Sequence, residues 1–213
     1  MSGEVTLTID GRRITARPGE KLLWAALDNG IYIPHLCAGR EDEHPDAACR
    51  LCFVEIEGVP RPVTACTEPV AAGMVVRTRS ERLDRLVGTA FELLLANHRL
   101  DCGRCPANRS CALQEIARQR GFKLKVTRLR VLEKNLPVDD SSPAVLYDPN
   151  RCVLCGRCVR ACRQSGGGVL GFAHRGFQRR VTTFGGASLA DAGCSGCGAC
   201  AAACPVGALT AKK

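Results

Sequence analysis

The chain has 213 residues, a formal net charge of +9 and 15 cysteines. This cysteine content is far above average usage but below that of a secreted disulfide scaffold, and an odd number of cysteines cannot all pair within one chain. The N-terminal "MSGEVTLTIDGRR" lacks the apolar core of a signal peptide, and "FELLLA" is far shorter than the roughly 20 residues that span a bilayer. We therefore expect a cytoplasmic protein whose cysteines bind metals.

Residues 1–79 carry the pattern of a small α+β domain. "VTLTI" and "RRITA" alternate apolar and polar residues around an Asp-Gly turn, which predicts a hairpin. "PGEKLLWAALDNG" places Leu23, Ala26 and Leu27 on one face and stops at Gly30, which predicts an amphipathic helix. "LCFVEIEG" and "MVVRT" predict further strands. A hairpin, a helix and returning strands with a cysteine loop after the helix resemble the β-grasp ferredoxin domain.

Four cysteines in this domain follow a C-x11-C-x2-C-x13-C pattern. They are Cys37, Cys49, Cys52 and Cys66. The first interval is longer than in the C-x4-C-x2-C run of plant-type [2Fe–2S] ferredoxins, so spacing alone leaves a zinc site open. The β-grasp setting favours a [2Fe–2S] cluster.

The next region, residues 80–132, is predicted to be a helical module with an H-x3-C-x2-C-x5-C box. Its candidate ligands are His98, Cys102, Cys105 and Cys111. A lone histidine near a helix end is usually a surface or capping residue, and one imidazole with three thiolates can also close a tetrahedral zinc site. From the residues alone, capping, zinc binding and iron–sulfur binding all stay open for His98.

Two near-copies of C-x2-C-x2-C-x3-C follow in residues 148–213, after a linker at 133–147 that is rich in Pro, Asp and Ser. In bacterial ferredoxins this run binds one [4Fe–4S] cluster through three cysteines, while the fourth binds the neighbouring cluster. The crossing predicts one cluster on Cys152, Cys155, Cys158 and Cys204, and another on Cys194, Cys197, Cys200 and Cys162. All 15 cysteines and one histidine are thereby assigned to four sites of four ligands.

The order of these motifs is similar to the N-terminal iron–sulfur region of the large subunit of respiratory complex I and its relatives. The similarity is carried by "HRLDCGRCPANRSCALQ" and "YDPNRCVLCGRCVRAC" and covers essentially the whole chain. It implies that His98 binds a [4Fe–4S] cluster, so that the cofactors are one [2Fe–2S] and three [4Fe–4S] clusters. A chain with all four sites that ends nine residues beyond Cys204 is most similar to the small diaphorase subunit of soluble NAD-reducing [NiFe] hydrogenases.

The resemblance implies a relay that passes single electrons between a flavin- and NAD(H)-binding subunit and a catalytic subunit. A [NiFe] hydrogenase is the expected catalytic partner, and related segments also occur in NAD-dependent formate dehydrogenases. No catalytic residue is expected on this chain, because "SGGG" at residues 165–168 lacks the context of a dinucleotide fingerprint and no Ser/His/Asp grouping is legible.

The net charge leaves one alternative of another class, a zinc-stapled nucleic-acid or assembly adaptor. The formal +9 counts every cysteine as neutral. Oxidised clusters with their thiolates would carry roughly −2, −1, −2 and −2, which would bring the loaded chain to about +2. We therefore expect neither nucleic-acid binding nor insertion into a membrane.

Overall fold

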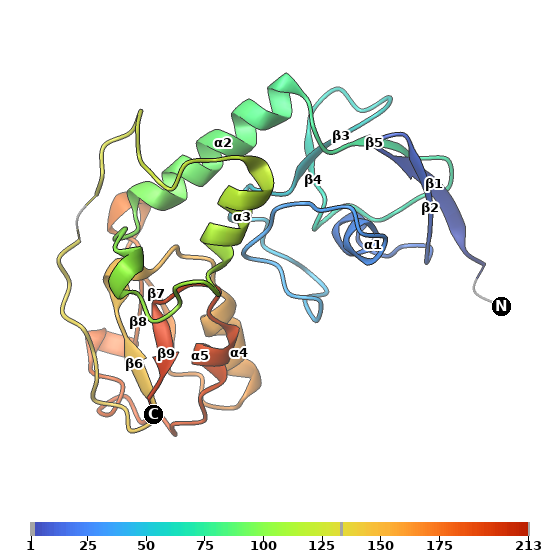
Figure 1. Ribbon diagram of the computed structural model, residues 1–213. Coiled ribbons are helices and arrows are strands. Elements are labelled where there is room, and N and C mark those ends of the chain that lie inside the picture. The colour runs from blue at the N-terminus through green and yellow to red at the C-terminus, as the bar shows by residue number, and fades with distance from the viewer. Residues whose placement is uncertain (1–2, 133, 213) are drawn as a thin grey trace. The chain divides into compact units, whose positions relative to one another are not determined.

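The computed structural model describes residues 3–132 and 134–212 and divides into two compact units, Met1–Phe91 and Glu92–Lys213 (Figure 1). The predicted domain spans also include residues 1, 2, 133 and 213, which lie outside the described residues. The first unit carries a five-stranded sheet in the order β2-β1-β5-β3-β4. Its strands are β1 (Val5–Ile9), β2 (Arg12–Ala16), β3 (Phe53–Ile56), β4 (Val63–Thr64) and β5 (Val75–Arg77).

The hairpin predicted at the start of the chain is present as β1 and β2, which pair antiparallel. Asp10 and Gly11 form its turn with φ values of 49° and 77°. A two-residue turn of this hand needs positive φ at both positions, which Asp and Gly tolerate best. The Asp10 carboxylate also accepts a hydrogen bond from the backbone N–H of Thr78 at 2.8 Å. The hairpin is thus tied to the residue that follows β5.

The predicted helix is α1 (Leu22–Asp28), and it ends before Gly30, whose φ is 72°. The helix packs into the core of the first unit together with the sheet. Leu23 and Ala26 are fully buried as expected, whereas Leu27 is only partly buried. Because five consecutive residues, 22–26, are buried, α1 is covered on more than the single face that the sequence pattern predicted.

Helix α2 (Glu81–Ala96) contains the boundary between the two units. Near its end, the carboxylate of Glu92 is buried and accepts hydrogen bonds from the backbone N–H groups of Thr127 at 2.6 Å and Arg128 at 2.5 Å. Glu92 therefore interrupts the apolar run of the sequence in order to anchor a loop of the second unit. No helix in residues 3–132 and 134–212 combines the length and the hydropathy needed to cross a membrane.

The remaining elements of the second unit are short. The helices are α3 (Ala112–Arg120), α4 (Arg157–Gln164) and α5 (Ala199–Ala203), with 3-10 turns at Cys102–Arg104, Pro149–Arg151, Gly176–Gln178 and Phe184–Gly186. Strand β6 (Val145–Tyr147) pairs with β9 (Leu209–Ala211), and β7 (Gly171–Ala173) pairs with β8 (Arg180–Thr182). Helices α4 and α5 pack against each other.

The segment predicted as a linker at 133–147 differs from that expectation in its last three residues, which form β6. They are a strand because β9, more than sixty residues later in the chain, supplies the pairing edge. Earlier in the segment, Asp139 and Tyr147 exchange backbone hydrogen bonds of 2.9 and 2.8 Å. The strand pairing and these hydrogen bonds therefore hold the described part of this linker against the ferredoxin-like region.

Candidate iron–sulfur sites

The four cysteines of the first unit lie together inside it. Cys37, Cys49, Cys52 and Cys66 are each at most 5% exposed. The Sγ atoms of Cys37 and Cys49 are 3.5 Å apart, and the thiols of Cys52 and Cys66 interact as a second pair. The hydrogen bond from Cys37 lowers the pKa of Cys49 to about 7, although burial opposes this. Four buried thiols are the donor set that a [2Fe–2S] cluster takes.

The loop that carries the first three of these cysteines has an unusual backbone. Ala47 and Arg50 adopt positive φ values of 49° and 55°, which residues with a Cβ rarely do. The backbone N–H of Cys49 points at Cys37 Sγ, at 3.5 Å. Hydrogen bonds to sulfur stabilise the thiolate form, so the loop conformation suits anionic ligands. Such local strain persists where surrounding structure fixes it.

His98 is buried and its ring is oriented by the backbone of a distant residue. It is 7% exposed, and its Nδ1 lies 2.7 Å from the carbonyl oxygen of Arg151. A carbonyl oxygen can only accept, so Nδ1 carries the proton and the Nε2 lone pair is left for a metal. Burial lowers the pKa of His98, which favours the neutral ring. The alternative of a surface histidine does not fit this environment.

The three cysteines of the same box come from the 3-10 turn at Cys102–Arg104 and the start of α3. Burial raises the pKa of Cys111, and the thiols of Cys105 and Cys102 raise it further. The guanidinium group of Arg151 interacts with the thiol of Cys105. One residue thus supports two candidate ligands, because its carbonyl holds His98 and its side chain reaches Cys105.

Each of the two ferredoxin-like copies shares a small cavity with the last cysteine of the other copy. One cavity is lined by Cys152, Cys155, Cys158 and Cys204, and the other by Cys162, Cys194, Cys197 and Cys200. These are the two crossed sets that the motif predicts. The remaining walls are mainly apolar, and burial raises the pKa of Cys155 to about 12. A thiolate there needs a positive partner, which bound iron would provide.

The two copies also share a local backbone pattern. In the first, Leu154 and Gly156 flank the second cysteine with φ values of 58° and 80°. In the second, Gly196 and Gly198 flank the equivalent cysteine with 72° and 74°. The left-handed residues curl the chain around one sulfur, and the second of each pair then begins α4 or α5. Leu154 differs from the three glycines, because it has a Cβ and yet occupies a conformation that favours glycine.

The three sites of the second unit are neighbours in series. Cys111 of the histidine-bearing box and Cys204 line one groove. Cys158, in the same cavity as Cys204, interacts electrostatically with Cys200 of the other cavity. The order in space is therefore the His98 box, then the Cys204 cavity, then the cavity of Cys200.

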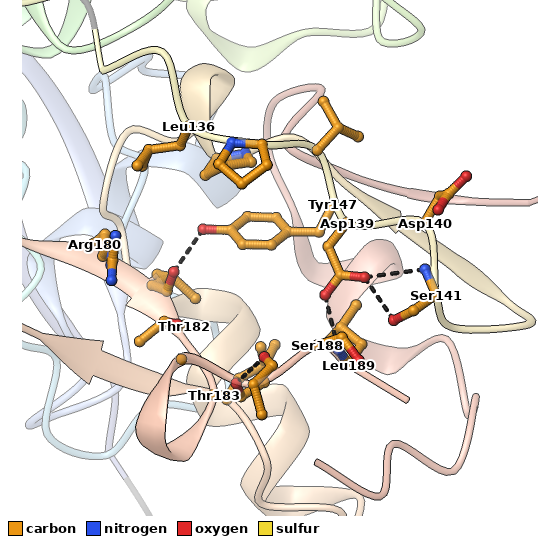
Figure 2. Close-up of a pocket in the computed structure, with 17 residues that line it drawn as sticks. Leu136, Asp139, Asp140, Ser141, Tyr147, Arg180, Thr182, Thr183, Ser188 and Leu189 are labelled. Atoms are coloured by element: carbon orange, nitrogen blue, oxygen red, sulfur yellow. Dashed lines mark hydrogen bonds between the residues drawn. The ribbon is translucent and has the colours of Figure 1, made fainter. Parts of the chain in front are cut away.

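A larger pocket beside the Cys204 cavity has no cysteine in its walls among the described residues (Figure 2). The ring of Tyr147 extends across it, and its hydroxyl donates a hydrogen bond of 2.7 Å to the carbonyl oxygen of Val181. Tyr147 and Val181 line both the pocket and the cysteine cavity. These two residues therefore form a wall between the pocket and the candidate cluster site.

The donor sets suit clusters rather than single ions. Thiols and one imidazole are the candidate ligands, and no carboxylate lines either ferredoxin-like cavity among the described residues. Over the same part of the chain, no three or more His, Cys, Asp or Glu side chains converge on the position of one metal ion. Iron–sulfur clusters spread their cysteine ligands over several iron atoms.

Three family descriptions match consecutive parts of this architecture. They are a 2Fe-2S iron-sulfur cluster binding domain at residues 2–81, the NADH-ubiquinone oxidoreductase-G iron-sulfur binding region at 88–123, and the ferredoxin-like domain of NADH-quinone oxidoreductase subunit 3 at 142–210. A chain in the crystal structure of an NAD+-reducing [NiFe]-hydrogenase in the H2-reduced state is 36% identical, with a TM-score of 0.86 over 98% of this chain and 87% of that one. The chain belongs to this iron–sulfur subunit family.

Two other members of the family are longer proteins. NADPH-Fe(3+) oxidoreductase subunit alpha of Geobacter sulfurreducens is 42% identical over 98% of this chain and 24% of its own length. NADP-reducing hydrogenase subunit HndD of Solidesulfovibrio fructosivorans is 35% identical over 96% of this chain and 36% of its own length. The chain thus spans about a quarter to a third of these relatives. Family membership makes it an iron–sulfur protein whose domains are those of subunits of NADH-quinone oxidoreductases.

Proposed function

We propose that the chain relays single electrons through one [2Fe–2S] and three [4Fe–4S] clusters, between a subunit that carries flavin and NAD(H) and a catalytic subunit. The observation that carries the proposal is the pair of crossed cavities, each lined by four cysteines. When bound, each cluster stores and releases one electron. The residues of the chain hold the clusters, exclude water from them and set their charge.

The serial order of the sites supports a directed path through the second unit. The His98 box adjoins the Cys204 cavity, which in turn adjoins the last cavity. In that last cavity Cys197 is exposed, whereas Cys152 and Cys158 of the middle cavity are buried. We assign the Cys197 site as the place where electrons leave or enter the chain, because a partner can approach it directly.

The neutral ring of His98 gives its cluster a different charge from the others. An imidazole in place of a thiolate makes the cluster about one charge less negative, which favours its reduced form. The hydrogen bond from Nδ1 to the Arg151 carbonyl keeps Nε2 directed away from that carbonyl and ready to bind iron. We therefore include His98 among the ligands, with Cys102, Cys105 and Cys111.

A flavin-bearing partner is required by the chemistry of NADH. Hydride transfer moves two electrons together, whereas a cluster accepts one, so a flavin must divide the pair. The hydrogenase structure, which is matched over 87% of the corresponding chain, supports a [NiFe] hydrogenase as the catalytic partner. An NAD-dependent formate dehydrogenase or another NADH-linked complex is the alternative, and a zinc-stapled adaptor is the alternative of another class.

Metal analysis of anaerobically purified full chain tests the cluster assignment. One two-iron and three four-iron clusters give about 14 iron and about 14 acid-labile sulfide per chain, and a brown colour. One zinc with about 10 iron would exclude the cluster at His98, and zinc alone would favour the adaptor.

A second experiment tests the partners. The isolated chain should accept electrons from dithionite but should not oxidise NADH with artificial dyes until the flavoprotein is restored. NADH oxidation by the flavin-free chain would contradict the relay. Nickel in the co-purified complex would identify a hydrogenase, whereas molybdenum or tungsten would favour formate dehydrogenase.

A further inference from the structure

Lys134 is half-buried in the second unit, and its ammonium group is enclosed. Its ammonium nitrogen is inaccessible to solvent and has no hydrogen-bond partner among the residues that the structure describes. Removing an ammonium group from water is unfavourable unless an anion compensates it. A negative charge near Lys134 would therefore stabilise its charged form.

The backbone on both sides of Lys134 is fixed. Leu132 donates its N–H to the carbonyl oxygen of Ala96 at 2.8 Å. Leu136 donates its N–H to the side-chain oxygen of Asn150 at 2.9 Å and accepts from the side-chain nitrogen of the same residue at 2.8 Å. Ala96 lies two residues before His98, and Asn150 lies two residues before Cys152. The two anchors therefore hold Lys134 between the histidine-bearing box and the Cys152 cavity.

The groove beside Lys134 supplies no anion. It is lined by Arg130, His174 and Arg180 as well as Lys134, and no carboxylate belongs to its described walls. The charge of Lys134 interacts with the thiol of Cys152 and with the ring of His98. The two candidate cluster sites, with which Lys134 interacts, would carry the counter-charge when they are loaded with iron.

We infer that Lys134 is the internal counter-charge of the clusters at the Cys152 and His98 sites and raises the reduction potentials of both. This inference rests on the proposed function. A fixed positive charge stabilises the reduced cluster, which carries one more negative charge, relative to the oxidised one. Lys134 is a positioning residue of the relay, since it acts on the clusters without binding iron or a substrate.

The test is a redox titration of the iron-loaded full chain followed by electron paramagnetic resonance. Lys134→Met removes the charge at similar length, Lys134→Gln removes it with a polar group, and Lys134→Arg retains it. Lys125→Met is the matched control, because Lys125 is exposed. Both neutral variants should shift two transitions downward by more than Lys125→Met does, while the other two transitions stay in place. Lys134→Arg should keep the wild-type potentials.

Each outcome decides the matter. Unchanged potentials in a neutral variant that retains its iron would overturn the inference, as would an equal shift in Lys125→Met. If both neutral variants lose iron from the Cys152 site and Lys134→Arg keeps it, the requirement for a counter-charge is supported. Loss of iron from Lys134→Arg as well would show that side-chain shape matters rather than charge. Wild-type chain without cluster signals would overturn the proposed function and this inference together, whereas intact signals with no shift would overturn this inference alone.

Discussion

The two units place the same ligand chemistry in different surroundings. In the first, all four cysteines are buried, and Cys52 and Cys66 belong to a core built by a five-stranded sheet and α1, in which Leu7, Ile9, Leu23 and Val54 are fully buried. In the second, the strands have three residues each, and cysteines themselves are a large part of the buried set. Small domains with little apolar area need additional cross-links. The comparison teaches that the first unit should keep its fold without iron, whereas the second unit should need iron in order to fold.

Removal of iron should give the largest difference between the units. Metal binding contributes directly to folding free energy where the protein core is insufficient. After anaerobic chelation, backbone amides in residues 142–210 should lose their protection from hydrogen exchange, whereas those of β1, β2 and α1 should keep most of theirs. Mass spectrometry of proteolytic fragments measures this. Equal loss in both units would break the comparison.

Two single substitutions should distinguish the two ferredoxin-like cluster sites of the second unit. Cys162→Ala should remove the cluster of the cavity that also holds Cys194, Cys197 and Cys200, leaving about 10 iron per chain. Cys204→Ala should instead remove the cluster of Cys152, Cys155 and Cys158. Iron analysis and electron paramagnetic resonance distinguish the two losses.

The matched control for this pair is Cys66→Ala in the first unit. It should affect only the [2Fe–2S] signal, because its thiol belongs to the other fold. If Cys162→Ala removed the signal assigned to the Cys152 site and spared the other, the crossed pairing of the ligands would be refuted.

The sequence predicted the first unit well, for a physical reason. Alternation in β1 and β2, the Asp-Gly turn and the glycine that ends α1 are local signals, and in this unit they agree with the global fold. The family and the α+β fold class, with its ferredoxin-like regions, were also predicted correctly from motif order. Helix α1 departs from its prediction because Trp24, which contacts His35 and Arg40, and Ala25 are buried as well.

Features that depend on distant residues were not predictable. Nothing in the sequence indicates that the Arg151 carbonyl holds His98, since 53 residues separate them. Gly207 is a second case, because a Cβ at that position would lie 2.6 Å from Cys105 Sγ. Spacing predicted candidate ligands for the sites, whereas the residues that orient and crowd those ligands emerge only from the fold. The ligand assignments themselves remain predictions.

Replacing His98 tests a subtler difference within the second unit. His98→Cys should add about one negative charge to its cluster and lower the potential of that one transition. The other three transitions should stay in place, including the [2Fe–2S] transition of the first unit. Redox titration checks the shift, and iron analysis confirms that the cluster is retained. An unchanged potential and line shape would remove His98 from the ligand list.

The smallest expected effect concerns the wall between the pocket and the Cys204 cavity. Tyr147→Phe deletes the hydroxyl that donates to the Val181 carbonyl at 2.7 Å, which should destabilise the second unit by about 1 kcal/mol. Burial raises the pKa of Tyr147, so the hydroxyl stays protonated and the effect should be constant across neutral pH. The midpoint temperature at which heating bleaches the visible absorbance should fall by roughly 4 °C.

The control is Thr78→Val, which removes a buried hydroxyl that donates to Asp10 in the first unit. It should leave the bleaching temperature of the three [4Fe–4S] clusters unchanged. Equal shifts in the two variants would mean that the units unfold together, and the contrast between an iron-independent and an iron-dependent fold would then fail.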